Sequence, residues 1–195
     1  MQQSKSKPKN ANKPKKSSVR IIGGSLKGRK VSFTEFKGLR PTLDRVRETL
    51  FNWLVADIHD ANCLDLYAGS GALGIEAISR GANSVILVDA NRKVSDNLKE
   101  NLQQLSIKNA KAINKKAEDF LTQNKNKFDL VFLDPPFEKG MLNSILELIK
   151  KHLANDALVY IEQENTGSKI VLGEEWNIIK SKETSRFCYS LLSLK

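Results

Sequence analysis

The chain has 195 residues, of which 40% are hydrophobic, a size and composition typical of one globular domain with its own core. Its formal net charge is +10, but residues 1–20 hold seven Lys or Arg and no acid, so the rest of the chain is only mildly basic. No apolar run follows this basic start and no stretch approaches membrane-spanning length, so we expect neither a signal peptide nor a transmembrane segment.

The first 18 residues are rich in Lys, Ser, Asn, Gln and Pro and contain almost no large apolar side chain. Such a segment buries too little surface to offset the entropy cost of ordering, which predicts a disordered basic tail over residues 1–18. The tail is either a mobile arm that attracts polyanions or a solubilising terminus without a dedicated role. We expect residues 19–195 to form a single domain.

The domain is expected to open with a hairpin and a helix. Two short strand-like pieces, 19–24 and 28–31, flank a turn, so residues 19–40 are interpreted as an N-terminal hairpin extension. A helix is predicted to follow Arg40, because the next apolar residues recur every three or four positions. These residues are Leu43, Val46, Leu50, Leu54 and Ile58.

From residue 62 onward, strand patterns alternate with helix patterns. This alternation predicts an α/β fold in which helices cover both faces of a parallel sheet, ending in a terminal hairpin over residues 176–194. The strands are predicted at 63–67, 85–88, 110–113, 128–133 and 157–163, and the helices at 72–80, 92–105, 117–122 and 141–153.

A glycine-rich segment joins the first of these strands to the first helix. Gly69, Gly71 and Gly74 allow a tight turn and a close approach to a ligand, and Asp89, at the end of the next strand, can accept both hydroxyls of a ribose. The pattern also fits a dinucleotide-binding dehydrogenase or a plain strand–turn–helix joint. Asp65 argues against the dinucleotide, because it would repel a pyrophosphate. It suits a cationic ligand bearing an ammonium and a sulfonium.

A second motif follows the most hydrophobic strand. Asp134 and the carbonyl of Pro135 can accept the two hydrogens of an –NH2 group, while Pro136 stiffens the turn. Phe137 offers a face for stacking a base, an interaction worth about 1–3 kcal/mol. The bland alternative is a rigid turn, but the preceding nucleotide-type motif favours a catalytic role for all four residues.

Together the two motifs resemble class I S-adenosylmethionine-dependent methyltransferases that act on amino groups of bases. Over residues 19–194 the chain more closely resembles the bacterial family that methylates the exocyclic amine of one guanine in small-subunit (16S) ribosomal RNA. The residues that carry the resemblance are 20–24, 28–30, 64–74, 134–137 and, most specifically, the block RPTLDRVRETLFNWL at 40–54.

The resemblance implies a Rossmann-like fold with a seven-stranded, mostly parallel sheet whose last hairpin adds an antiparallel strand. It also implies S-adenosylmethionine as cofactor. One departure is Lys116, which stands where the family has a small polar or acidic residue beside the adenine. Glu118 is then the candidate partner of the adenine amine. The implied cofactor-binding residues are Asp65, Ala68, Gly69, Ser70, Gly71, Asp89, Ala117, Glu118 and Asp134.

Basic residues near the start of the domain are candidates for RNA contacts. Arg40 and Thr42 belong to a loop that is implied to close over cofactor and RNA, and Arg29 lies in the hairpin. Arg45 and Arg47 either contact phosphate or form solvated pairs with neighbouring acids on the helix. Other polar and aromatic residues receive structural interpretations: Tyr67 and Trp53 as packing residues, and Glu162 and Glu164 as surface residues that follow a strand.

We therefore expect a guanine-amine methyltransferase acting on small-subunit ribosomal RNA, within an assembled particle because the domain itself is only mildly basic. An adenine-amine methyltransferase on DNA or other RNA and a catalytically silent RNA-binding protein remain alternatives. The two cysteines, Cys63 and Cys188, lack the spacing of a disulfide framework or metal site. We expect no metal, a cytoplasmic location and a monomer.

Overall fold

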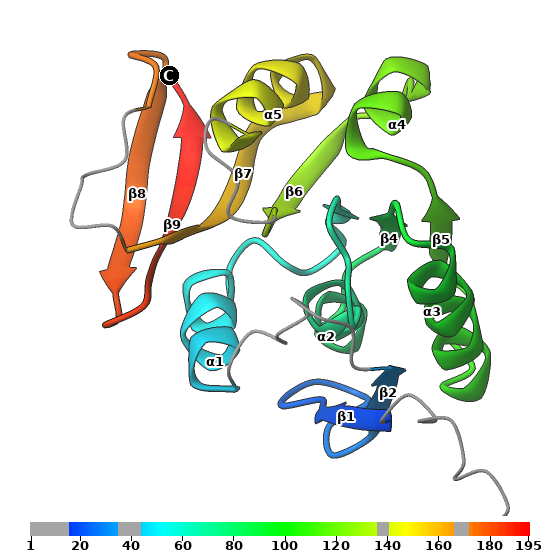
Figure 1. Cartoon of the computed structure of the whole chain (residues 1–195). Coiled ribbons are helices and arrows are strands. Elements are labelled where there is room, and N and C mark those ends of the chain that lie inside the picture. Colours follow the sequence, from blue (N-terminus) through cyan, green and yellow to red (C-terminus); the bar gives the residue numbers. More distant parts are fainter. Residues whose placement is uncertain (1–15, 35–43, 136–140, 166–171) are drawn as a thin grey trace, which may run out of the picture.

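The computed structural model describes residues 16–34, 44–135, 141–165 and 172–195 (Figure 1). Its centre is a seven-stranded sheet with the order β5-β4-β3-β6-β7-β9-β8. The first five of these strands run parallel, β9 runs antiparallel to β7, and β8 runs antiparallel to β9. The predicted fold class, including the reversed strand of the terminal hairpin, is confirmed. The strands are β3 (Asn62–Asp65), β4 (Ser84–Asp89), β5 (Ala110–Asn114), β6 (Phe128–Leu133), β7 (Leu153–Glu164), β8 (Trp176–Glu183) and β9 (Phe187–Leu194).

Helices cover both faces of this sheet, as the strand–helix alternation predicts. Figure 1 shows α1, α2 and α3 below the sheet and α4 and α5 above it. Alternate residues of β6 divide between two cores: Phe132 packs among residues of α1, α2 and α3, whereas Val131 packs with α4 and α5. The helices are α1 (Asp44–Trp53), α2 (Ala72–Ser79), α3 (Arg92–Gln104), α4 (Ala117–Gln123) and α5 (Met141–Ile149).

The N-terminal extension is a separate antiparallel pair, β1 (Lys16–Arg20) and β2 (Lys30–Thr34). The predicted hairpin is therefore present, but its first strand begins at Lys16, so residues 16–18 form a strand rather than the end of a disordered tail. Asn101 of α3 holds the second strand: its Oδ1 accepts from Ser32 N at 3.1 Å, and its Nδ2 donates to Ser32 O at 2.7 Å.

The predicted end of one helix shifts where tertiary pairing intervenes. The helix expected over 141–153 ends at Ile149 and continues as a short 3-10 turn, η1 (Lys150–His152). Leu153 already pairs with Phe128, so strand pairing overrides the helical periodicity there. Within the described ranges, no helix is long and apolar enough to cross a membrane.

Candidate active site

The glycine-rich turn between β3 and α2 has a backbone that only glycine adopts easily. Gly69 and Gly71 have positive φ angles of 50° and 77°, and Gly71 N donates to Ala68 O at 2.6 Å to close the turn. A Cβ atom on Gly71 would lie 2.5 Å from Leu98 Cδ2. Ala68 and Ser70 are buried within the same turn. The predicted cofactor loop is thus packed against α3 at Gly71, where a side chain has no room.

Asp65, the last residue of β3, is only 4% exposed and is held by this turn. Its Oδ2 accepts a hydrogen bond from Gly74 N at 3.0 Å. Gly74 approaches so closely because it lacks a side chain: a Cβ there would lie 2.5 Å from Leu87 Cδ2 and 3.1 Å from Asp65 Oδ2. Burial raises the pKa of Asp65 to about 7, although the hydrogen bond from Gly74 lowers it and the charge of Asp89 raises it further.

Asp89 lies at the end of the adjacent strand β4 and connects two loops. Its Oδ2 accepts from Gly69 N at 3.0 Å and its Oδ1 from Asn91 N at 2.7 Å. Burial raises the pKa of this carboxyl despite the two backbone hydrogen bonds. Since each carboxylate oxygen can accept more than one hydrogen bond, both oxygens keep acceptor capacity for the hydroxyls of a ligand.

Asp134 directly follows β6, on the other side of β3 from Asp89. It is partly buried, and Pro135 beside it is buried. Burial, followed by the charges of Glu162 and Asp65, holds the pKa of Asp134 well above its usual range. The ends of β4, β3 and β6 therefore bring the three predicted aspartates to one edge of the sheet.

These three carboxyls have no cationic counterpart within the part of the chain that the structure describes. No Lys, Arg or His there forms an ion pair with Asp65, Asp89 or Asp134. Burying carboxylates without compensating charge is costly, which is why their pKa values rise. A ligand that brings positive charge would offset this cost, so the donor set fits a group with an ammonium and a sulfonium.

The start of α4 borders the same loop. Ala117 is buried, whereas Lys116 and Glu118 are exposed. Burial raises the pKa of Tyr67, and the charge of Glu118 raises it further, which places Glu118 near the loop after β3. The Tyr67 hydroxyl is buried and has no hydrogen-bond partner among the described residues. Tyr67 thus presents a polar atom beside the predicted adenine position, which its interpretation as a packing residue does not account for.

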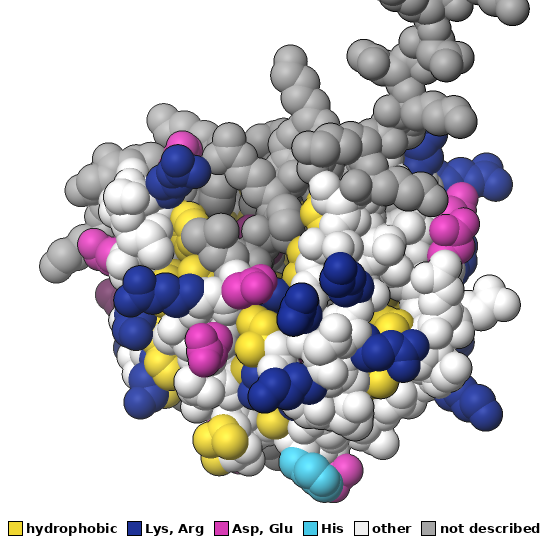
Figure 2. Space-filling view, turned by 90° about the horizontal axis from the view of Figure 1, so that it is seen from below, with side chains coloured by type: hydrophobic (Ala, Val, Ile, Leu, Met, Phe, Trp, Pro, Cys, Tyr) yellow, Lys and Arg dark blue, Asp and Glu magenta, His cyan; other side chains and the backbone are white. Residues whose placement is uncertain are grey.

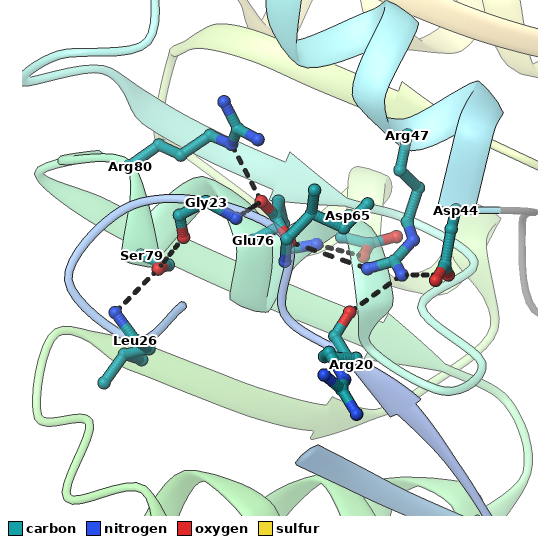
Figure 3. A network of polar contacts seen from close by, with 11 residues as sticks. Arg20, Gly23, Leu26, Asp44, Arg47, Asp65, Glu76, Ser79 and Arg80 are labelled. Carbon is teal, nitrogen blue, oxygen red and sulfur yellow. Dashed lines mark hydrogen bonds and ion pairs between the residues drawn. The ribbon is translucent and has the colours of Figure 1, made fainter. Parts of the chain in front are cut away.

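Arg47 is more deeply buried than either role that the sequence suggested for it. Its side chain is fully buried, so it does not reach a phosphate, and although it does pair with the neighbouring exposed acid Asp44, the guanidinium itself is not solvated (Figure 3). Nη2 donates to Asp44 Oδ1 at 2.6 Å and to Arg20 O at 2.9 Å, while Nη1 lies 3.6 Å from Glu76 Oε2. Arg47 therefore joins β1, α1 and α2 from inside the protein.

Glu76 of α2, which sequence reasoning did not single out, is the centre of this network. Its two oxygens accept from Ile22 N and Gly23 N, each at 2.8 Å, and from Arg80 Nε at 2.8 Å. The available signal was an acid in the otherwise apolar stretch ALGIEAI, where only a buried partner makes a charge tolerable. Glu76 attaches the N-terminal extension to the helix that follows the glycine-rich turn.

Glu162 is also misplaced by sequence reasoning, which put it on the surface after a strand. It is 5% exposed and lies inside β7, because that strand extends to Glu164 and is paired by β9 on its far side. Tyr160 donates a hydrogen bond from its hydroxyl to Glu162 Oε1 at 2.8 Å.

Two other residues lie where the sequence predicted. Glu164 is exposed, and Trp53 is partly buried against Tyr189, with ring centroids 5.4 Å apart.

Two of the predicted RNA-contact residues can be placed. Arg45 on α1 and Arg29 in the turn of the hairpin are both exposed, as are Lys27 and Lys30. Figure 2, which views the molecule from below Figure 1, shows several Lys and Arg side chains spread over this face with acidic side chains among them. Arg40, Thr42, Pro136 and Phe137 lie outside the described residues.

Known proteins resemble this chain along nearly its whole length. Residues 19–193 match the family model described as conserved hypothetical protein 95. Proteins named ribosomal RNA small subunit methyltransferase D from Escherichia coli and Haemophilus influenzae are each 44% identical to it, over 89% and 90% of this chain and 88% and 94% of their own. The solved structure of the Escherichia coli protein yhhF is 42% identical, with a TM-score of 0.82 over 92% of this chain and 99% of that one.

The match covers both motifs and the sheet edge where the three aspartates meet. On the extent of the family match and the identity to these relatives, the chain belongs to the conserved hypothetical protein 95 family, together with the bacterial proteins named ribosomal RNA small subunit methyltransferase D.

Proposed function

We propose that this protein transfers a methyl group from S-adenosylmethionine to the exocyclic amine of a guanine in small-subunit ribosomal RNA. Family membership and the names of the relatives support the coarser statement, that the chain is an S-adenosylmethionine-dependent ribosomal RNA methyltransferase. The choice of guanine rests on the likeness of the block at 40–54 to guanine-methylating enzymes, because an adenine-amine methyltransferase would use the same Asp134-Pro135-Pro136-Phe137 chemistry.

The observation that carries the proposal is the meeting, around a glycine turn, of three carboxyls that have no ion-pair partner among the residues that the structure describes. Asp65, beside the turn, would face the positively charged part of the cofactor. Gly69 and Gly71 would let the backbone of the turn approach the cofactor closely. Asp89 would accept the ribose hydroxyls, while Ala117 and Glu118 would border the adenine. When bound, the cofactor supplies a methyl group activated by its attachment to a sulfonium.

The acceptor side of the site would be built on the turn after β6. Asp134 and the Pro135 carbonyl would accept the two amine hydrogens, orienting the nitrogen lone pair and opposing its conjugation with the ring. Phe137 would stack on the base. A base inside a paired helix cannot reach such a pocket, so we expect the target guanine to lie in a loop or to be unstacked on binding.

RNA would be held by basic residues on the neighbouring face. Arg45 and Arg29 are exposed and available for phosphate contacts, and we propose the same role for Arg40 and Thr42. Because the chain outside the first 20 residues is only mildly basic, we propose an assembled small-subunit particle, rather than free RNA, as the substrate. We further propose that the enzyme acts as a monomer.

The test is methyl transfer from labelled S-adenosylmethionine to small-subunit particles that lack native methylation, followed by digestion to nucleosides. Wild type would be compared with Asp134→Ala and with Asp119→Ala, a control in the exposed part of α4. We expect label in N2-methylguanosine for wild type and the control, and none for Asp134→Ala. Label in methyladenosine would overturn the choice of base, and cofactor binding without transfer to particles or free RNA would overturn the substrate. Absence of both binding and transfer would favour a silent RNA-binding protein.

A further inference from the structure

Glu162 is a buried carboxylate beside the proposed acceptor site, and nothing in the function proposed above uses it. It lies in β7, the strand next to β6 in the sheet. The parallel register pairs Phe132 with Tyr160 and Leu133 with Ile161. Extending this register by one residue brings Asp134, just beyond the end of β6, next to Glu162 of β7.

Asp134 and Glu162 also share a face of the sheet. Side chains alternate along a strand, so both lie on the side of Phe132 and Tyr160, which belong to the core under α1 and α2. The charge of Glu162 is a main cause, after burial, of the raised pKa of Asp134. The two carboxyls are therefore close enough to act on each other electrostatically.

The groups facing Glu162 keep its carboxylate in place. The Tyr160 hydroxyl donates to Oε1, and burial together with Glu162 itself holds the pKa of Tyr160 well above its usual range, so this hydroxyl remains a donor. Tyr189 of β9 is the cross-strand partner of Glu162 and stacks on Trp53. Besides Glu162, Asp65 is the acid whose charge raises the pKa of Asp134.

We propose that Glu162 is a positioning residue for methyl transfer: its buried carboxylate acts through Asp134, making Asp134 a stronger acceptor for the hydrogens of the amine and for the proton that leaves it. A negative charge next to a carboxylate raises its proton affinity, and the raised affinity strengthens the hydrogen bonds that it accepts. This inference rests on the proposed function, because it assumes that Asp134 faces an amine.

Methyl transfer releases one proton from the amine, and Glu162 would help Asp134 to accept it. The lone pair of the amine forms the new N–C bond, and the bond between methyl and sulfur breaks with its electron pair going to sulfur. The nitrogen then carries a positive charge and one proton too many. That proton passes to the Asp134 carboxylate, which becomes a carboxylic acid stabilised by the neighbouring anion of Glu162, and is later released to water.

The first test needs neither cofactor nor RNA. In the full chain with 13C-labelled aspartate carboxyls, the Asp134 signal, assigned with Asp134→Asn, would be followed through a pH titration. In Glu162→Gln we expect its midpoint to fall by about one pH unit or more, because a neighbouring charge has been removed. Tyr160→Phe should shift it in the same direction by less, since Glu162 then loses a hydrogen bond that favours its charged form. The matched control is Glu164→Gln, two residues further along the same strand and exposed. An unchanged midpoint in both Glu162→Gln and Tyr160→Phe would overturn the inference.

The second test measures single-turnover methyl transfer against pH. In Glu162→Gln we expect the acidic limb of the profile to move to lower pH and the plateau rate to fall about tenfold, with unchanged affinity for cofactor. A merely structural role would lower the rate without moving the limb, and that result would also contradict the inference. If wild type transfers no methyl to guanine, the proposed function fails, while the titration still decides whether Glu162 acts on Asp134.

Discussion

Arg47 and Glu76 form an ion pair in which neither side chain is exposed, with Nη1 3.6 Å from Oε2. Removing two charges from water costs several kcal/mol for each, and only additional hydrogen bonds make such a pair tolerable. Here Glu76 accepts two backbone N–H groups from the loop after β1, and Arg47 donates to the Arg20 carbonyl at the end of that strand. The pair therefore fixes the N-terminal extension to the domain (Figure 3).

Glu76→Ala should destabilise the protein strongly. The substitution removes one of the two carboxylates that pair with the buried Arg47, and it leaves the amides of Ile22 and Gly23 without their acceptor. We expect the free energy of unfolding to fall by about 3–5 kcal/mol, measured by urea denaturation. Glu48→Ala, at an exposed position on α1, should change it by less than about 0.5 kcal/mol. Equal effects of the two substitutions would show that the buried pair does not hold the extension.

The two cases that sequence reasoning missed, Glu76 and Glu162, share one physical cause. An acid looks solvated in a sequence, because its burial depends on partners that arrive from distant elements. Ile22, Gly23 and Arg47 supply them for Glu76, more than 25 residues away along the chain. Such distant partners cannot be predicted from the periodicity of apolar residues in the sequence.

The parts that sequence reasoning predicted are those that depend on local order. Alternating apolar segments predict the parallel sheet, and short-range glycine chemistry predicts the turn at Gly69 and Gly71. The position of Asp65, Asp89 and Asp134 at one sheet edge follows from the rule that parallel strands end on the same side. Boundaries failed where pairing across the sheet decided them, as at Leu153, which joins β7 instead of ending a helix.

Gly71→Ala should separate packing from backbone strain in the cofactor turn. Gly71 and Gly28 both have positive φ angles, 77° and 85°, but a Cβ on Gly71 would lie 2.5 Å from Leu98 Cδ2 whereas one on Gly28 meets nothing within 4 Å. Both substitutions add strain of about 1–2 kcal/mol, and only Gly71→Ala adds overpacking of about 1–3 kcal/mol more. We expect calorimetry to show no S-adenosylmethionine binding for Gly71→Ala and unchanged binding for Gly28→Ala. Similar affinities would mean that the turn does not contact the cofactor.

Replacing the exposed basic residues of the hairpin turn should weaken RNA binding without affecting cofactor binding. The triple variant Lys27→Ala, Arg29→Ala and Lys30→Ala removes three charges from side chains that are exposed in the structure. For each phosphate that the hairpin no longer neutralises, the negative slope of log affinity against log salt concentration should become shallower by about 1. Lys180→Ala with Lys182→Ala, on the edge strand β8, is the control. A salt slope equal to that of wild type in the triple variant would exclude the hairpin from the RNA interface.

Because the pKa of Asp65 is raised by folding, its contribution to stability should decrease as pH rises, which is the opposite of the usual behaviour of a carboxyl group. Its pKa rises from 3.8 to about 7 on folding, so between these values the native state binds more protons than the unfolded state. The stability contributed by the neutral carboxyl is fully present below pH 3.8 and is lost as pH rises through 7. The loss is on the order of 4 kcal/mol at most, and the raised pKa values of Asp89 and Asp134 act in the same direction.

Asp65→Asn should therefore make the protein more stable at pH 8.5 while weakening its function. The amide oxygen can still accept from Gly74 N, but no charge is buried, so urea denaturation should show the full gain over wild type at pH 8.5 and a smaller gain at pH 5. Asp96→Asn, exposed on α3, should show neither effect. Because the charged carboxylate is the form that would attract a cationic ligand, the affinity of wild type for S-adenosylmethionine should increase as pH rises through 7, and that of Asp65→Asn should be lower and increase less. A variant that is equally destabilised at both pH values would show that Asp65 is held for its hydrogen bond rather than for its charge.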